Sequence, residues 1–187
     1  MKTITLMSQK GGVGKSTFAF FLQALYKRDG YAVSFRDEDG QGSIIAPYES
    51  DNPDVVIVDT PGHLPDANQL ISWIKPSDLI IIPLNPTRLN IEPYMRMRYM
   101  LKPWEEKGKQ VITIINQYNP SYIASRHFVD WYRQNYTNET STTFYFPQSE
   151  LVRQAAEYQS LVTVSSSVKN AIEMLYDTTR DMLGLEV

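Results

Sequence analysis

The residues with the clearest chemical potential form a glycine- and lysine-rich run near the start of the chain, QKGGVGKST at Gln9–Thr17. Its glycines are Gly11, Gly12 and Gly14. Glycines let a backbone curl so that successive N–H groups point inward, which suits phosphate oxygens. Lys15 adds a positive charge for β- and γ-phosphates, and the Ser16 hydroxyl can ligate Mg²⁺. The run therefore predicts a phosphate-binding loop, to which the N-terminus of a following helix adds its dipole.

Two later segments carry carboxylates directly after apolar stretches. One reads Asp37-Glu38-Asp39-Gly40-Gln41-Gly42-Ser43, and the other is Val55–Val58 followed by Asp59-Thr60-Pro61-Gly62. A carboxylate near a γ-phosphate can position water and accept its proton, and a carboxylate on a buried strand can join a Mg²⁺ shell. Each segment taken alone also fits an ordinary acidic turn at the end of a strand.

Hydrophobic periodicity predicts the elements that position these residues. Strands are expected at Lys2–Met7, Tyr31–Arg36, Asp54–Asp59, Leu79–Leu84, Gln110–Asn116, Thr142–Phe146 and Leu161–Val164. Helices are expected at Ser16–Arg28, Leu64–Ile74, Tyr94–Lys107, Tyr122–Gln134 and Val168–Leu183, with Pro86 and Pro93 bracketing a loop and Ser166 or Ser167 as the last helix's N-cap.

This alternation predicts an α/β fold, a mostly parallel twisted sheet with helices on both faces. Ligands in such sheets bind at the carboxyl ends of strands, where the three loops would form one site. The chain shows no linker or internal repeat, so we expect residues 1–187 to form a single domain.

Composition excludes several classes of protein. The chain has 187 residues, a formal net charge of -3 and no cysteine, which removes disulfides and thiolate metal sites. No apolar run approaches the roughly 18 residues that a membrane helix needs, and the first residues lack the apolar core of a signal peptide. We therefore expect a cytoplasmic protein that begins near Met1.

The loop departs from the usual Gly-x-x-x-x-Gly-Lys-[Ser/Thr] pattern, because Gln9 stands at the first glycine position and Lys10 adds a second lysine. This variant resembles the deviant Walker A motif of the ParA/MinD family of dimeric ATPases. The resemblance implies that ATP binds at Gly11, Gly12, Val13, Gly14, Lys15, Ser16 and Thr17. It also implies that Lys10 reaches the partner subunit's nucleotide in a homodimer. The structural alternative for Lys10 is a solvated loop cation.

The acidic segments fit the same resemblance. Asp37–Gly42 is similar to the family's Asp-x-Asp-Pro-Gln-Gly segment, with Gly40 in place of proline. By that match Asp39 orients the attacking water, and Asp37 helps to hold Mg²⁺. Asp59 corresponds to Walker B, and Thr60-Pro61-Gly62 resembles the switch region. The implied catalytic residues are Lys10, Lys15 and Asp39, and the implied metal residues are Ser16, Asp37 and Asp59.

Two further positions resemble the family's adenine site. Asn116 ends a predicted strand where the family places an asparagine that recognises adenine. Phe146 and Pro147 end a later strand, where family members flank the base with backbone and proline. Asn116 also begins a run, Asn116-Gln117-Tyr118-Asn119-Pro120, that is typical of a simple turn.

Within the family, the sequence favours a small ParA-type DNA partition ATPase. Cluster-carrying relatives need cysteines, and the MinD branch has a basic membrane helix. The last helix here instead carries an inward apolar stripe, Val168, Ala171, Ile172, Leu175, Thr179, Met182 and Leu183. The resemblance then implies nucleoid association, nonspecific DNA binding by the ATP dimer, a ParB-type adaptor and no membrane. Candidate DNA contacts are Arg88, Arg96, Arg98, Lys102, Arg126, Arg133, Arg153 and Lys169, while Trp131, Tyr132 and Tyr136 fit core packing better than base stacking.

One departure leaves rival functions open. Only Gly42–Pro53 separates the second loop from the third strand, whereas family members have a longer connection. The rivals are a MinD-like positioning ATPase, a P-loop metabolic ligase of the dethiobiotin-synthetase type, and a nucleotide switch with negligible hydrolysis.

Overall fold

A computed structural model describes residues 1–39, 49–63, 66–136, 142–157 and 166–185. Six strands form one sheet in the order β2-β3-β1-β4-β5-β6, and every neighbouring pair is parallel. The strands are β1 (Lys2–Leu6), β2 (Val33–Asp37), β3 (Val55–Asp59), β4 (Leu79–Leu84), β5 (Gln110–Tyr118) and β6 (Thr142–Pro147). The predicted α/β fold is confirmed. The expected strand at Leu161–Val164 lies outside the described residues.

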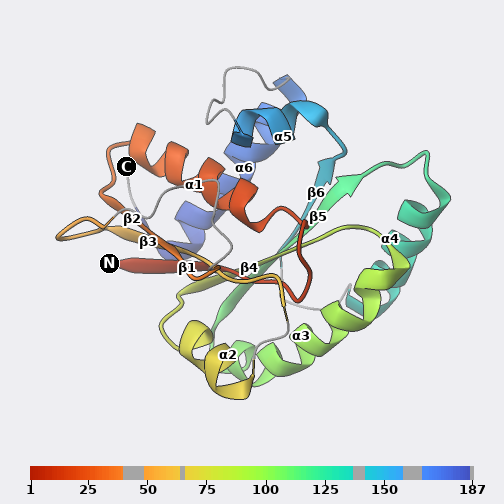
Figure 1. Cartoon of the computed structure of the whole chain (residues 1–187), viewed down its shortest axis with the longest axis horizontal. Helices are drawn as coiled ribbons and strands as arrows, with labels where there is room; N and C mark the ends of the chain where they lie inside the picture. The colour runs from red at the N-terminus through yellow and green to blue at the C-terminus, as the bar shows by residue number, and fades with distance from the viewer. Residues whose placement is uncertain (40–48, 64–65, 137–141, 158–165, 186–187) are drawn as a thin grey trace.

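Helices cover both faces of this sheet. They are α1 (Lys15–Arg28), α2 (Ala67–Ile74), η1 (Arg88–Asn90), α3 (Ile91–Glu105), α4 (Ile123–Tyr136), α5 (Glu150–Glu157) and α6 (Ser166–Leu183). Helices α1, α5 and α6 lie on one face and α2, α3 and α4 on the other (Figure 1). The chain adds β2 and β3 on one side of β1 and then β4, β5 and β6 on the other, so right-handed crossovers place the helices on opposite faces.

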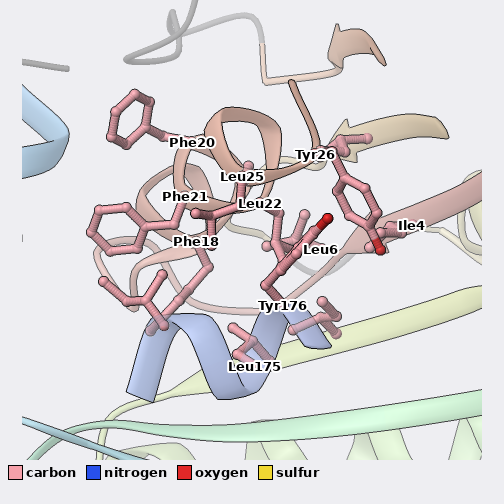
Figure 2. Close-up of a cluster of buried hydrophobic side chains, with 14 of the residues drawn as sticks. Ile4, Leu6, Phe18, Phe20, Phe21, Leu22, Leu25, Tyr26, Leu175 and Tyr176 are labelled. Atoms are coloured by element: carbon pink, nitrogen blue, oxygen red, sulfur yellow. The ribbon is translucent and has the colours of Figure 1, made fainter. Parts of the chain in front are cut away.

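The larger hydrophobic cluster packs α1 and α6 against one face of the sheet. Phe18, Leu22 and Leu25 of α1 are buried together with Ile4 and Leu6 of β1 and with the inner face of α6 (Figure 2). Burying a side chain of this size contributes about 1.5 to 3 kcal/mol. The helix that follows the glycine-rich loop is therefore held rigidly, and so is the loop's end.

The predicted inward stripe of the last helix is confirmed. Val168, Ile172, Leu175, Thr179 and Leu183 are buried, and Ala171 and Met182 pack against the same core. Among the described residues, the structure contains no helix with both the length and the apolar character needed to cross a bilayer.

Several predicted boundaries were wrong. Helix α3 begins at Ile91, so Pro93 lies in its first turn, where backbone N–H groups have no helical partner and proline is tolerated. Ser166 and Ser167 lie inside α6 rather than at its N-cap. Helix α5 was not expected, because its eight residues are too few for periodicity to identify.

Candidate functional site

The carboxyl ends of all six parallel strands lie at one edge of the sheet, where the predicted loops meet. In the register of the sheet, Asp59 of β3 lies opposite Leu6 of β1 on one side and opposite Asp37 of β2 on the other. The glycine-rich loop leaves β1 directly after Leu6. The sheet therefore brings the loop and two of the predicted carboxylates to adjacent positions, as expected of carboxyl ends of parallel strands.

A cavity of about 740 Å³ opens at this edge. It is lined by Gly11, Gly12, Gly14, Lys15, Ser16, Thr17, Asp39, Gly62, His63, Asn116, Gln117, Pro147, Gln148, Ser149, Glu150 and Val152. Its volume is in the range of small-molecule and cofactor sites. The structure thus brings most of the predicted nucleotide residues together around one space.

The glycine-rich loop adopts a conformation that only glycine allows at two positions. Gly12 has φ 71° and Gly14 has φ 103°, both in the left-handed region. A Cβ atom on Gly14 would also lie 2.6 Å from Nδ2 of Asn116. Gly14 is the N-cap of α1 and has no side chain to cap the helix. Since Lys15, Ser16 and Thr17 line the cavity, the first N–H groups of α1 are available there to an anion.

Lys15 is buried and folds back over the start of the loop. Its side chain is 6% exposed, and Nζ donates a hydrogen bond to the Lys10 carbonyl oxygen at 3.5 Å. Burial lowers the pKa of Lys15, and the charges of Asp59 and Asp39 oppose that shift. A phosphate group in the cavity would add further negative charge beside this ammonium and stabilise its charged form against the loss of hydration.

Ser16 and Asp59 form the polar floor of the site. The Ser16 hydroxyl donates to Oδ2 of Asp59 at 2.5 Å, and Asp59 is fully buried. Burial raises the pKa of Asp59 to about 6, the Ser16 hydrogen bond and Lys15 oppose the rise, and the charges of Asp37 and Asp39 add to it. A buried carboxylate held in this way gains from a nearby cation.

The oxygen donors at this floor fit Mg²⁺ when phosphate is also present. In the described parts of the chain, no group of three or more His, Cys, Asp or Glu side chains could hold a metal ion alone. Mg²⁺ commonly takes one or two protein ligands and completes its shell with water and substrate phosphates. Ser16 and Asp59 would supply the protein ligands, and the ion would neutralise phosphate charge.

The described part of the second acidic loop runs to Asp39. The Asp39 N–H donates to Oδ1 of Asp37 at 2.8 Å, and the Glu38 N–H donates to the Asp59 carbonyl at 2.9 Å. Asp39 lines the cavity, whereas Asp37 does not. The predicted water-orienting residue is therefore in the site, and Asp37 shapes the turn that carries it.

The segment after β3 is hydrogen-bonded to the end of β1 and packs against the glycine-rich loop. Both N–H and Oγ1 of Thr60 donate to the Leu6 carbonyl, at 3.2 and 2.9 Å. A Cβ atom on Gly62 would lie 2.7 Å from the Gly11 Cα, so glycine is needed for this close approach. His63 comes next and lines the cavity. Sequence reasoning overlooked His63, although it is one of only two histidines and directly follows the predicted switch residues.

The opposite end of the cavity carries the predicted adenine residues. Nδ2 of Asn116 donates to the Val13 carbonyl at 2.9 Å, and its Oδ1 accepts the Gln117 N–H at 2.9 Å. Gln117 has φ 56°, an unusual backbone conformation for a residue other than glycine. The Asn116 amide is thus fixed against the phosphate loop, with one donor and one acceptor position left for a ligand.

The two residues at the end of β6 have different environments. Pro147 lines the cavity, whereas the Phe146 ring is buried with its centroid 4.8 Å from that of Phe18. Phe146 can therefore contribute only its backbone to a ligand, as the resemblance to the family implies.

Among the candidate DNA contacts, Arg98 was a wrong prediction. It is 5% exposed, pairs with Glu105 at 2.9 Å and lies over the Tyr136 ring. The remaining candidates with described side chains are exposed, namely Arg88, Arg96, Lys102, Arg126, Arg133 and Lys169. The Arg153 side chain is outside the described set. Trp131, Tyr132 and Tyr136 belong to the core beneath α3 and α4, as predicted.

Comparisons with solved structures agree with this fold. A McdA variant from Cyanothece in complex with ATP is 18% identical over 100% of this chain and 98% of its own, with a TM-score of 0.74. A plasmid partition protein from Borrelia burgdorferi bound to AMPPNP is 16% identical over 96% of this chain and 99% of its own, with a TM-score of 0.74.

Other relatives of the same fold have different roles. The cell division protein MinD from Aquifex aeolicus is 16% identical over 100% of this chain and 98% of its own, with a TM-score of 0.70. No curated protein matches the chain. The profile of the CobQ/CobB/MinD/ParA nucleotide binding domain matches residues 4–182, which contain the whole cavity. The chain therefore belongs to the CobQ/CobB/MinD/ParA family of nucleotide-binding domains.

Proposed function

We propose that this chain is a Mg²⁺-dependent ATPase of the DNA partition type, formed as one domain over residues 1–187. Two copies enclose ATP, the dimer binds DNA without sequence preference, and hydrolysis stimulated by a ParB-type adaptor releases it. The protein would then work on the nucleoid. Each part of this cycle can be tested on its own.

The place of Lys10 is the observation that carries the proposal. Its neighbours Gly11 and Gly12 line the cavity, but Lys10 does not. It lines a separate small crevice with Asn90 and Pro93 and is half-buried. A second lysine beside a phosphate loop, yet outside that loop's own cavity, supports the proposal that Lys10 serves the nucleotide of another subunit.

Hydrolysis is supported by the groups that converge on the cavity. Lys15 and the N-terminus of α1 supply positive charge, Ser16 and Asp59 supply oxygen ligands for Mg²⁺, and Asp39 supplies a carboxylate for the attacking water. Catalysis of phosphoryl transfer consists mainly of positioning and charge neutralisation, which these groups provide.

DNA binding is supported by the charge of one helical layer. Over residues 88–136, which include η1, α3 and α4, six Lys and Arg side chains are exposed against three Asp and Glu. The inward packing of α6 also removes its apolar face from contact with a membrane, which favours partition over MinD-like positioning.

Sedimentation of the Lys10→Ala variant tests the dimer. We expect wild-type protein to sediment as a dimer with ATP and Mg²⁺ and as a monomer with ADP, and Lys10→Ala to remain monomeric with ATP while still binding it. The exposed Lys107, in the turn that follows α3, gives the matched control, and Lys107→Ala should dimerise normally. Unchanged dimerisation of Lys10→Ala contradicts the proposed role.

ATPase rates measured with and without nonspecific duplex DNA and adaptor separate the rival functions. Stimulation by DNA and adaptor supports partition. Dependence on a small carboxylate substrate would indicate a metabolic ligase, and absence of turnover would indicate a nucleotide switch.

A further inference from the structure

His63 is the one imidazole among the residues that line the nucleotide cavity. It is exposed and belongs to the segment that follows β3. The other histidine, His127, lies on α4 and does not line the cavity.

The hydrogen bonds of the site separate its two ends. Asn116 contacts the late part of the glycine-rich loop, at Val13, and marks the end expected for the base. Lys15, which serves the β- and γ-phosphates in such loops, reaches back to the carbonyl of Lys10 at the start of the loop. The terminal phosphate therefore belongs at the Lys10–Gly11 end.

His63 is held at that same end. Gly62 sits so close to the loop that an added Cβ would lie 2.7 Å from the Gly11 Cα and 3.1 Å from the Lys10 carbonyl carbon. Thr60 is tied to the end of β1 by two hydrogen bonds to Leu6. His63, the residue after Gly62, therefore lines the cavity next to the start of the loop, and Asp39 lines the same cavity.

We propose that His63 is a further catalytic residue, which accepts a proton from the water that attacks the terminal phosphate. This inference depends on the proposed ATPase function. Histidine is the side chain most often used for proton transfer in enzymes, and a positioned base contributes typically 10²- to 10⁴-fold in rate. Asp39 would hold the water, and His63 would take its proton.

The step balances without any additional reactant. The water oxygen forms a bond to the γ-phosphorus, and the bond from that phosphorus to the β,γ-bridging oxygen breaks, leaving the electron pair on ADP. One water proton passes to the imidazole nitrogen of His63 and then to solvent, which the exposed ring contacts. The products are ADP and inorganic phosphate.

Single-turnover hydrolysis of bound ATP tests this role. We expect His63→Ala and His63→Gln to lower the rate about 100-fold. Their affinity for ATP should stay within threefold of wild type, because the groups that hold the phosphates are untouched. His127→Ala is the matched control and should keep the wild-type rate. A His63→Ala or His63→Gln variant that hydrolyses ATP at the wild-type rate overturns the inference.

Proton NMR provides a readout that does not need turnover, because the chain has only two histidines. Addition of Mg²⁺ with a non-hydrolysable ATP analogue should shift the His63 ring signals more than Mg²⁺ with ADP does, and leave those of His127 in place. Equal shifts with both nucleotides contradict a place beside the terminal phosphate.

Binding of the same analogue to wild type and to Lys15→Ala distinguishes a failure of the proposed ATPase function from a failure of the role of His63. If wild type binds no nucleotide, the proposed function itself fails. If it binds nucleotide in a Lys15-dependent way and hydrolyses it at a rate that His63 substitutions do not change, the proposed function stands and the role of His63 is wrong.

Discussion

Asp59 is a carboxylate that the fold buries at a cost when no cation is bound. Its side chain has no exposed surface, and its pKa is raised to about 6. A carboxyl whose pKa is higher in the folded state than in the unfolded state contributes stability below about pH 4. That contribution is lost as the pH rises through 6. At pH 8 the folded protein therefore carries the full cost of the charge.

Removing that charge should stabilise the nucleotide-free protein. Asp59→Asn keeps an oxygen that can accept the Ser16 hydrogen bond. We expect it to raise the free energy of unfolding at pH 8 by roughly 2 to 3 kcal/mol, from about 1.4 kcal/mol per pKa unit. The gain should shrink as the pH is lowered to 5. Urea unfolding at both pH values measures it.

The matched control is Asp51→Asn, which changes an exposed carboxylate. It should alter stability by less than about 0.5 kcal/mol at either pH. A gain for Asp59→Asn that is equal at pH 5 and pH 8 would contradict the assignment of the cost to its charge.

The sequence predicted which residues line the site better than it predicted how these residues pack against one another. Lys15, Ser16 and Asp39 line the cavity because their motifs fix residue types at positions that the parallel sheet brings together. His63 belongs to no such motif. The packing of Gly62 on Gly11 and the burial of Arg98 depend on neighbours distant in sequence, which residue types and periodicity do not specify.

At the level of elements, Asn116 joins the end of β5 to the glycine-rich loop. Its amide spans the gap with one hydrogen bond to Val13 and accepts another from Gln117. Gln117 adopts its unusual backbone conformation where the pairing of β5 with β6 shifts register between Ile115 and Tyr118. This strained end of β5 suggests that the loop is held in shape before a nucleotide binds.

This link makes a prediction that separates positioning from base recognition. Asn116→Ala should weaken the binding of ATP about tenfold, because a buried hydrogen bond to the loop is lost. It should weaken the binding of inorganic tripolyphosphate by a similar factor. Isothermal calorimetry measures both. Asn135→Ala, on the exposed side of α4, is the control and should change neither affinity.

The two ligands should respond differently if Asn116 does not support the glycine-rich loop. Weaker binding of ATP with unchanged binding of tripolyphosphate would mean that Asn116 acts on the base alone.

The sequence predicted the six described strands closely but the connections poorly. Long apolar runs such as Leu79–Leu84 allow few alternatives in a sheet covered on both faces. Helix starts were less certain, since Pro93 could equally end a loop or occupy a first turn. The short α5 is held by packing on α1, through residues such as Val152 and Ala155, rather than by its own periodicity.

At the scale of the molecule, the net charge of -3 conceals an uneven distribution. Several carboxylates, including Asp39 and Asp59, lie at the nucleotide site, whereas η1, α3 and α4 present an excess of exposed basic side chains. Phosphate contacts depend on local cations rather than on total charge, so a mildly acidic chain can still carry a DNA-binding face.

That distribution predicts which layer of the molecule contacts DNA. With ATP, binding to nonspecific duplex DNA should weaken steeply as salt rises, with a slope that reports the number of phosphates neutralised. Lys102→Ala on α3 should reduce that slope by about one and lower the affinity for every DNA sequence alike. Lys169→Ala removes an exposed cation from α6 on the opposite face of the sheet and should leave the slope unchanged. Fluorescence anisotropy across a salt series measures both variants. Equal binding with ATP and ADP would contradict the nucleotide-dependent cycle, and an equal loss from Lys102→Ala and Lys169→Ala would contradict the placement of the DNA on the α3 and α4 layer.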